Sequence, residues 1–167
     1  AAGSVTSSAA VLTVNPAATS PVINSQPSAQ ILPAGTTTAS FTVSATGTPA
    51  ITSYQWERQI GGVGSFTSVT DGVSGATTFS GATTATLSLT GVTPSMNGDV
   101  FRVVIGNGTT PTTSSTALLT VQGTAPSITT TPSSTTTDAG LTATFTGSAS
   151  GNPTPTVKWQ RQAFNTS

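Results

Sequence analysis

Apolar and polar residues alternate over short runs along the chain, and Gly, Pro or Asn residues separate these runs. Alternation with a period of two is the pattern of a half-buried β-strand, and no stretch shows the 3.6-residue period of a helix. Within residues 21–121 the pattern predicts seven strands: Val22–Gln26, Thr38–Ala45, Ser53–Gln59, Phe66–Thr70, Ala85–Leu89, Val100–Ile105 and Ser115–Val121. We expect an all-β fold, an antiparallel two-sheet sandwich.

The same alternation predicts which side chains form the core, because successive strand residues point to opposite faces. The expected inward side chains are Phe41, Val43, Leu87, Leu89, Phe101, Val103 and Leu119, and Trp56 shares one strand face with Tyr54. Pro27 and Pro33 should interrupt the first strand and keep it at an edge, since proline cannot donate to a ladder.

The sequence also repeats. Ser7–Val14 (SSAAVLTV) nearly matches Ser114–Val121 (SSTALLTV), and the residues after each copy match again at a period of about 105 residues, which indicates tandem domains. The predicted organisation is: 1–14, the last strand of a preceding repeat; 15–20, a linker; 21–121, a complete domain; 122–125, a linker; 126–167, the first strands of a following repeat. Linkers this short, with Pro16, Pro21 and Pro126, should restrict bending.

Composition narrows the possible functions. Charged residues make up 5% of the 167 residues, the net charge is zero, and His and Cys are absent. Four scattered cations cannot form the basic stripe that nucleic acid requires, and zinc, haem and iron–sulfur centres would lack their usual ligands. We therefore expect no cofactor and no nucleic-acid partner. No run approaches the roughly 20 apolar residues of a membrane span, and the N-terminus shows no signal-peptide pattern.

Several motifs carry a family resemblance. They are Ala34–Trp56, Gly81–Thr93 (GATTATLSLTGVT), Asn97–Asn107 (NGDVFRVVIGN) and Ser114–Val121. In their order and spacing they resemble the tandem immunoglobulin-like (Ig-like) repeats of large bacterial cell-surface and secreted proteins. The resemblance covers the central unit and both flanking segments. It implies an extracellular or cell-surface location, as does the near absence of Lys and Glu.

The departures from the family pattern are informative. Disulfide-bearing members have a Cys on the second strand facing a Cys on the sixth, with a Trp packed on the bridge. By this resemblance the Cys positions are Val43 and Val103, the Trp is Trp56, and the tyrosine of the sixth strand is Phe101. We therefore expect no disulfide, and a core in which Trp56 packs on the two valines by burial alone. The third unit has Gly147 at the Val43 position.

Few residues suggest chemistry. Glu57 and Arg58 are expected on opposite strand faces as solvent-exposed charges, and Asp71-Gly72 and Asn97-Gly98-Asp99 look like turns. Without His, and with the single Lys at position 158, no Ser has a base to activate it. We expect no catalysis.

Two surfaces could bind or carry sugars. Phe66 and Phe79 lie in the Gly61–Gly81 stretch and could stack on sugar rings, although burial preferences favour a place at the core rim. Asn107 and Asn165 match the N-glycan acceptor pattern, and the run 127–137 is rich in Ser and Thr. Otherwise these residues form an uncharged hydrated surface.

The first functional hypothesis is a structural repeat of an extracellular stalk or filament, whose partners are neighbouring repeats in a homopolymer or bundle. The second is an adhesin module that binds a glycan or surface protein through its end loops, and the third is an accessory module of a larger secreted enzyme. Exchange of Val5–Val14 into the open sheet of another copy is a further possibility, although tandem continuity explains the same sequence with fewer assumptions.

Overall fold

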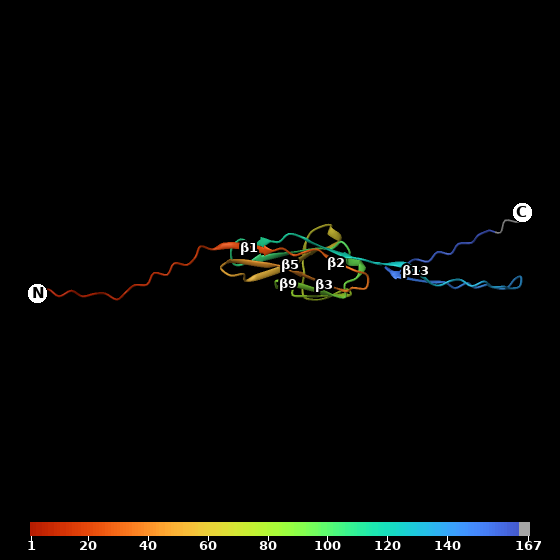
Figure 1. Cartoon of the computed structure of the whole chain (residues 1–167), viewed down its shortest axis with the longest axis horizontal. Helices are drawn as coiled ribbons and strands as arrows, with labels where there is room; N and C mark the ends of the chain where they lie inside the picture. Colours follow the sequence, from red (N-terminus) through yellow and green to blue (C-terminus); the bar gives the residue numbers. More distant parts are fainter. Residues whose placement is uncertain (164–167) are drawn as a thin grey trace.

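The computed structural model describes residues 1–163. The chain is elongated, with its two ends pointing away from a compact central part (Figure 1). The strands are β1 (Thr19–Ser25), β2 (Gln30–Leu32), β3 (Thr38–Thr42), β4 (Ser44–Thr48), β5 (Ser53–Gln59), β6 (Thr67–Ser68), β7 (Gly72–Ser74), β8 (Thr77–Ser80), β9 (Thr86–Thr90), β10 (Val100–Gly106), β11 (Thr112–Thr113), β12 (Ala117–Val121), β13 (Thr124–Thr130) and β14 (Ser148–Asn152). Among these residues no helix is long and apolar enough to cross a membrane.

The central part is a sandwich of two sheets, as the alternation predicted. One sheet has the strand order β2-β12-β10-β5-β6, with β11 beside β10, and the other has the order β3-β9-β8-β7. Every ladder is antiparallel except the one between β12 and β2. The all-β fold is therefore confirmed, with one parallel pair that the sequence did not indicate.

The predicted first edge strand is divided between two ladders. β1 pairs with β4 in a separate two-stranded sheet, whereas β2 pairs with β12 in the larger sheet of the sandwich. Pro27 lies between β1 and β2, and Pro33 follows β2, so the missing N–H groups end each short ladder. The predicted strand Thr38–Ala45 is likewise divided at Val43 into β3 and β4.

The Gly61–Gly81 stretch is more ordered than the sequence suggested. β7 and β8 form a hairpin in which Ser74 pairs with Thr77. The turn begins at Gly75, whose φ of +63° suits glycine. The stretch therefore contains β7 and β8 in addition to the strand predicted over Phe66–Thr70, which is shortened to β6, and the hairpin extends the sheet beyond β9.

Alternating side chains from the two sheets meet in one core. The expected core residues are all buried: Phe41, Val43, Trp56, Leu87, Leu89, Phe101, Val103 and Leu119. Around them are further buried apolar side chains, including Leu32, Val69, Phe79, Val92, Met96 and Ile105. The core prediction from strand alternation is therefore confirmed.

A second, smaller ladder follows the sandwich. β13 pairs with β14, with Ile128 opposite Ala149, as Ile23 lies opposite Ala45 in the β1–β4 ladder. Both ladders also carry irregularities at the corresponding places. In these two strands the sequence repeat is therefore also a structural repeat.

Two of the predicted boundaries differ from the structure. β13 begins at Thr124, so only Gln122 and Gly123 separate it from β12, and the linker predicted over 122–125 is shorter. Val5–Val14 forms no strand in the described chain, although a last strand was expected there. Its counterpart β12 pairs with β10 and β2 of the central unit, and within residues 1–163 no strand pairs with Val5–Val14.

Candidate functional site

The core is centred on Trp56. Trp56 is fully buried, Val103 lies directly opposite it in the β5–β10 ladder, and Val43 belongs to the same buried cluster. The indole Nε1 donates a hydrogen bond to the carbonyl oxygen of Thr84 at 2.9 Å, so the one polar atom of the side chain is satisfied. Here the two sheets are held together by burial, by this side-chain hydrogen bond and by a backbone hydrogen bond from the Trp56 amide to the Ala82 carbonyl oxygen at 2.9 Å.

Phe101 stands where the family pattern has a tyrosine. Its ring stacks on Phe41, with centroids 4.8 Å apart, and Phe41 also lies tilted against Trp56 at 6.3 Å. Three aromatic rings therefore pack together in the same buried cluster as Val43 and Val103. Aromatic pairs at these distances contribute about 0.5–1.5 kcal/mol each beyond their buried area.

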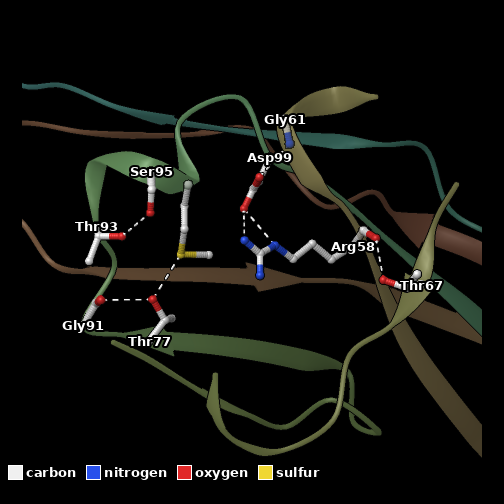
Figure 2. A network of polar contacts seen from close by, with 9 residues as sticks. Arg58, Gly61, Thr67, Thr77, Gly91, Thr93, Ser95 and Asp99 are labelled. Atoms are coloured by element: carbon white, nitrogen blue, oxygen red, sulfur yellow. Dashed lines mark hydrogen bonds and ion pairs between the residues drawn. The ribbon is translucent and has the colours of Figure 1, made fainter. Parts of the chain in front are cut away.

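Arg58 and the buried Asp99 form an ion pair (Figure 2). Arg58 Nη2 lies 2.6 Å and Nε 2.8 Å from Asp99 Oδ2, and the Gly61 amide donates to Asp99 Oδ1 at 2.8 Å. The Asp99 side chain has no exposed surface. The expectation that Arg58 faces solvent is therefore wrong: it shares the inner strand face with Trp56, where a guanidinium needs a partner.

Glu57 also has a partner, on the outer face of the same sheet. It lies opposite Arg102 in the β5–β10 ladder, and Arg102 Nε donates to Glu57 Oε2 at 2.7 Å. The Arg102 guanidinium covers the ring of Phe66, 3.9 Å from its centroid. Glu57 is thus part of a cross-strand pair and not a free charge.

The polar residues read as turns do shape turns, and their side chains also receive backbone hydrogen bonds. Asp71 Oδ1 accepts from the Ala82 amide at 2.7 Å, and Asn97 Oδ1 accepts from the Val121 amide at 2.9 Å. Asn97 and Gly98 do form a turn, whereas Asp71 lies at a bend before β7, which begins at Gly72, and Asp99 is the buried partner of Arg58. Among residues 1–163, no three His, Cys, Asp or Glu side chains gather as metal ligands.

The two phenylalanines proposed for sugar stacking do not form an open platform. Phe79 is buried in the core, and Arg58 lies over its ring at 5.7 Å from the centroid. Phe66 is half-buried beneath Arg102. The alternative reading, that these rings fill the rim of the core, describes Phe79 fully and Phe66 in part.

Asn107 is buried, contrary to its expected exposure as a glycan acceptor, and only 2% of its surface is accessible. Its Nδ2 donates to the carbonyl oxygens of Thr19 and Pro49, at 2.8 and 2.9 Å. Because a glycan is bulky and attaches to this nitrogen, the folded unit leaves no acceptor here. Asn165 lies outside the described residues.

The sequence reading missed the Arg58–Asp99 pair and the buried role of Asn107. Alternation along the strand offered a signal for the Arg58–Asp99 pair, because Arg58 lies two residues after the inward-facing Trp56 and therefore points to the same face. No local signal indicated the second, because the partners of Asn107 lie 88 and 58 residues earlier in the chain.

Comparison with known proteins agrees with this architecture. Residues 126–166 match the immunoglobulin I-set domain family. Endoglucanase C of Cellulomonas fimi is 32% identical over 145 residues, which is 87% of this chain and 12% of that protein. The chain thus spans about an eighth of the length of the curated relative that it matches. The sandwich topology and these matches identify an immunoglobulin-like (I-set) domain in this chain, distantly homologous to part of Endoglucanase C.

Proposed function

We propose that the chain is a non-catalytic, Ig-like accessory segment of a larger secreted bacterial enzyme that acts on a glucan. The observation that carries this proposal is the extent of the match to Endoglucanase C, which covers most of this chain and only 12% of that protein. The homologous sequence is therefore one part of a large enzyme. Its location would be extracellular.

The charged residues support a structural role for the central unit. All three of its carboxylates already have partners within the fold: Glu57 with Arg102, Asp99 with Arg58, and Asp71 with the Ala82 amide. Catalysis on a glycosidic bond requires two carboxyl groups that flank the substrate. In this unit the carboxylates instead hold a cross-strand pair, the Arg58 guanidinium and the Ala82 amide.

The accessory role is tested by dissecting the complete protein. Its full coding sequence should contain a separate catalytic domain and an export signal. Deletion of residues 21–121 should leave hydrolysis of a soluble glucan unchanged while altering activity on the insoluble polymer. The isolated chain should release no reducing sugar from either. Release of sugar by this chain, or a complete coding sequence without an enzyme domain, would refute the proposal.

The second candidate is a repeat of an extracellular stalk or filament. It is favoured by the near-identical registers of the β1–β4 and β13–β14 ladders and by the two-residue junction between units. A series of such units would provide reach and could associate laterally with copies of itself. Electron micrographs of the complete protein should then show long strings or bundles, whereas compact particles would favour the enzyme.

A further inference from the structure

Side chains from the C-terminal part of the unit bind the backbone at the start of β1. Asn107 Nδ2 donates to the Thr19 carbonyl, and Thr112 Oγ1 donates to the Pro21 carbonyl at 2.7 Å. The Thr19 side chain makes a further contact: its Oγ1 accepts a hydrogen bond from the Thr48 amide at 3.3 Å. The backbone that enters the unit is therefore tied both to the turn after β4 and to the loop after β10.

Asn107 uses its whole amide in this arrangement. Its two N–H groups reach the Thr19 and Pro49 carbonyls, and its Oδ1 accepts from the Thr109 amide at 3.3 Å and from Thr109 Oγ1 at 2.7 Å. The space for it exists because residue 47 is glycine: a Cβ there would lie 2.7 Å from Asn107 Nδ2. A buried amide with every position satisfied holds a single orientation.

At the junction with the following repeat, the entering chain lies against the equivalent turn of that repeat. Gly123 precedes β13 as Ala18 precedes β1, and Asn152 ends β14 as Thr48 ends β4. A Cβ on Gly123 would collide with the Asn152 carbonyl oxygen, so the backbone lies directly against this turn. On the other side, the Gln122 amide donates to the Leu32 carbonyl of the central unit at 2.9 Å. Both residues of the junction are thus held.

We propose that the turn at 48–49 and the loop 107–109 (Asn-Gly-Thr) form a seat for the start of β1, so that the folded unit fixes the direction from which the linker of the preceding repeat enters. The seat binds Thr19, and the exposed residues 15–18 lead directly into it. The Asn-Gly-Thr triplet is then the mark of the seat and not of a sugar acceptor. The seat acts in the same way whatever the larger protein does.

The absence of Cys allows a direct test by paired spin labels. Ala17→Cys and Thr90→Cys place one label on the linker and one on β9, and pulsed electron paramagnetic resonance measures the distribution of distances between them. We expect a single narrow distribution. Asn107→Asp replaces the side-chain NH2 group, which donates to two carbonyl oxygens, by a carboxylate oxygen that faces them, and a released linker should broaden the distribution about twofold.

Two controls make the result specific. Asn24→Asp introduces the same change at an exposed position, where the carboxylate can still accept from Thr46 Oγ1, and the distribution should stay narrow. A label pair within the unit, Ser68→Cys and Thr90→Cys, should keep its distance in every variant. A broad linker distribution in the unsubstituted chain, or an unchanged one in Asn107→Asp with the inner pair intact, overturns the proposal.

If Asn107→Asp also broadens the inner pair, the unit has unfolded and a milder variant decides. Thr109→Val keeps the shape of the side chain and removes the hydroxyl that orients Asn107 Oδ1. The linker distribution should widen to a smaller degree while the inner pair stays narrow. An unchanged linker distribution in Thr109→Val then overturns the proposal.

Discussion

The central unit and the segment that follows it place equivalent residues in opposite surroundings. Trp56 is fully buried, whereas its counterpart Trp159 is 58% exposed. Phe41 is buried and its counterpart Phe145 is half-exposed. Yet the β1–β4 and β13–β14 ladders have matching registers. The comparison separates what a short stretch of chain determines by itself from what needs distant strands.

The ladder is determined by its own two strands and by the prolines and glycines around them. Burial of the indole is not, because Val103 from β10 lies opposite Trp56 and Thr84 accepts its N–H. Among residues 126–163 no counterpart of β9, β10 or β12 is present. Alternation in the sequence therefore indicates which side chains share one face of a strand. Those side chains become buried only when other strands pack on that face.

The largest effect should come from Trp56→Ala. Removing a fully buried Trp costs about 3–5 kcal/mol of unfolding free energy, because the partners cannot close the cavity. The matched change Trp159→Ala should cost less than about 0.5 kcal/mol. Urea titrations followed by far-ultraviolet circular dichroism measure both, and similar losses in the two variants would contradict the comparison.

The next effect concerns the buried ion pair. Asp99→Ala leaves Arg58 without its partner on the inner face, which should cost about 3 kcal/mol. The exposed Asp138 lies in the third unit, and Asp138→Ala should change the stability by less than about 0.5 kcal/mol. The same urea titrations apply. A small loss for Asp99→Ala would mean that water replaces the carboxylate.

A third variant makes the central unit resemble the third. Val43→Gly introduces the residue found at position 147, and loss of the buried side chain together with added chain entropy should cost about 2–3 kcal/mol. In the reverse change, a Cβ at Gly147 would lie 3.3 Å from the outer edge of the Trp159 ring, which is free to shift. Gly147→Val should therefore be nearly neutral. Thermal unfolding midpoints of the two variants provide the check.

The smallest effect should come from the outer pair. Glu57→Gln again copies the third unit, which has Gln160 at this position, and should cost about 0.5 kcal/mol at low salt. The difference should disappear in about 1 M salt, because partly exposed charges are screened. A loss that persists at high salt would show that the pair acts through packing of Arg102 on Phe66.

Much of the sandwich follows from the sequence alone. β10 is long and alternates strictly, so its bounds and its inward residues could be predicted closely. The bounds of β5 were predicted as well, but the inward position of its Arg58 was not. β2, β7 and β11 have two or three residues each, too few for a period of two to be recognised. Those short strands exist because longer neighbours provide a ladder for them.

The polar contacts were harder to predict than the core. Asn107 carries an acceptor triplet that suggests exposure, and its burial depends on Gly47 and on the start of β1 in three dimensions. Asp99 stands beside Gly98 in an ordinary turn sequence, and its partner lies 41 residues earlier. The local residue types predict the turn at this position. The strand topology, which the local sequence does not show, places the partner beside Asp99.

The two-residue junction has a consequence for how such a protein changes length. Gln122 is held by the unit before it and Gly123 by the unit after it, so no residue at the junction is spare. Losing or inserting one or two residues here would pull a strand out of register. Whole units can be duplicated or deleted without that damage, so the overall length should evolve in steps of one repeat.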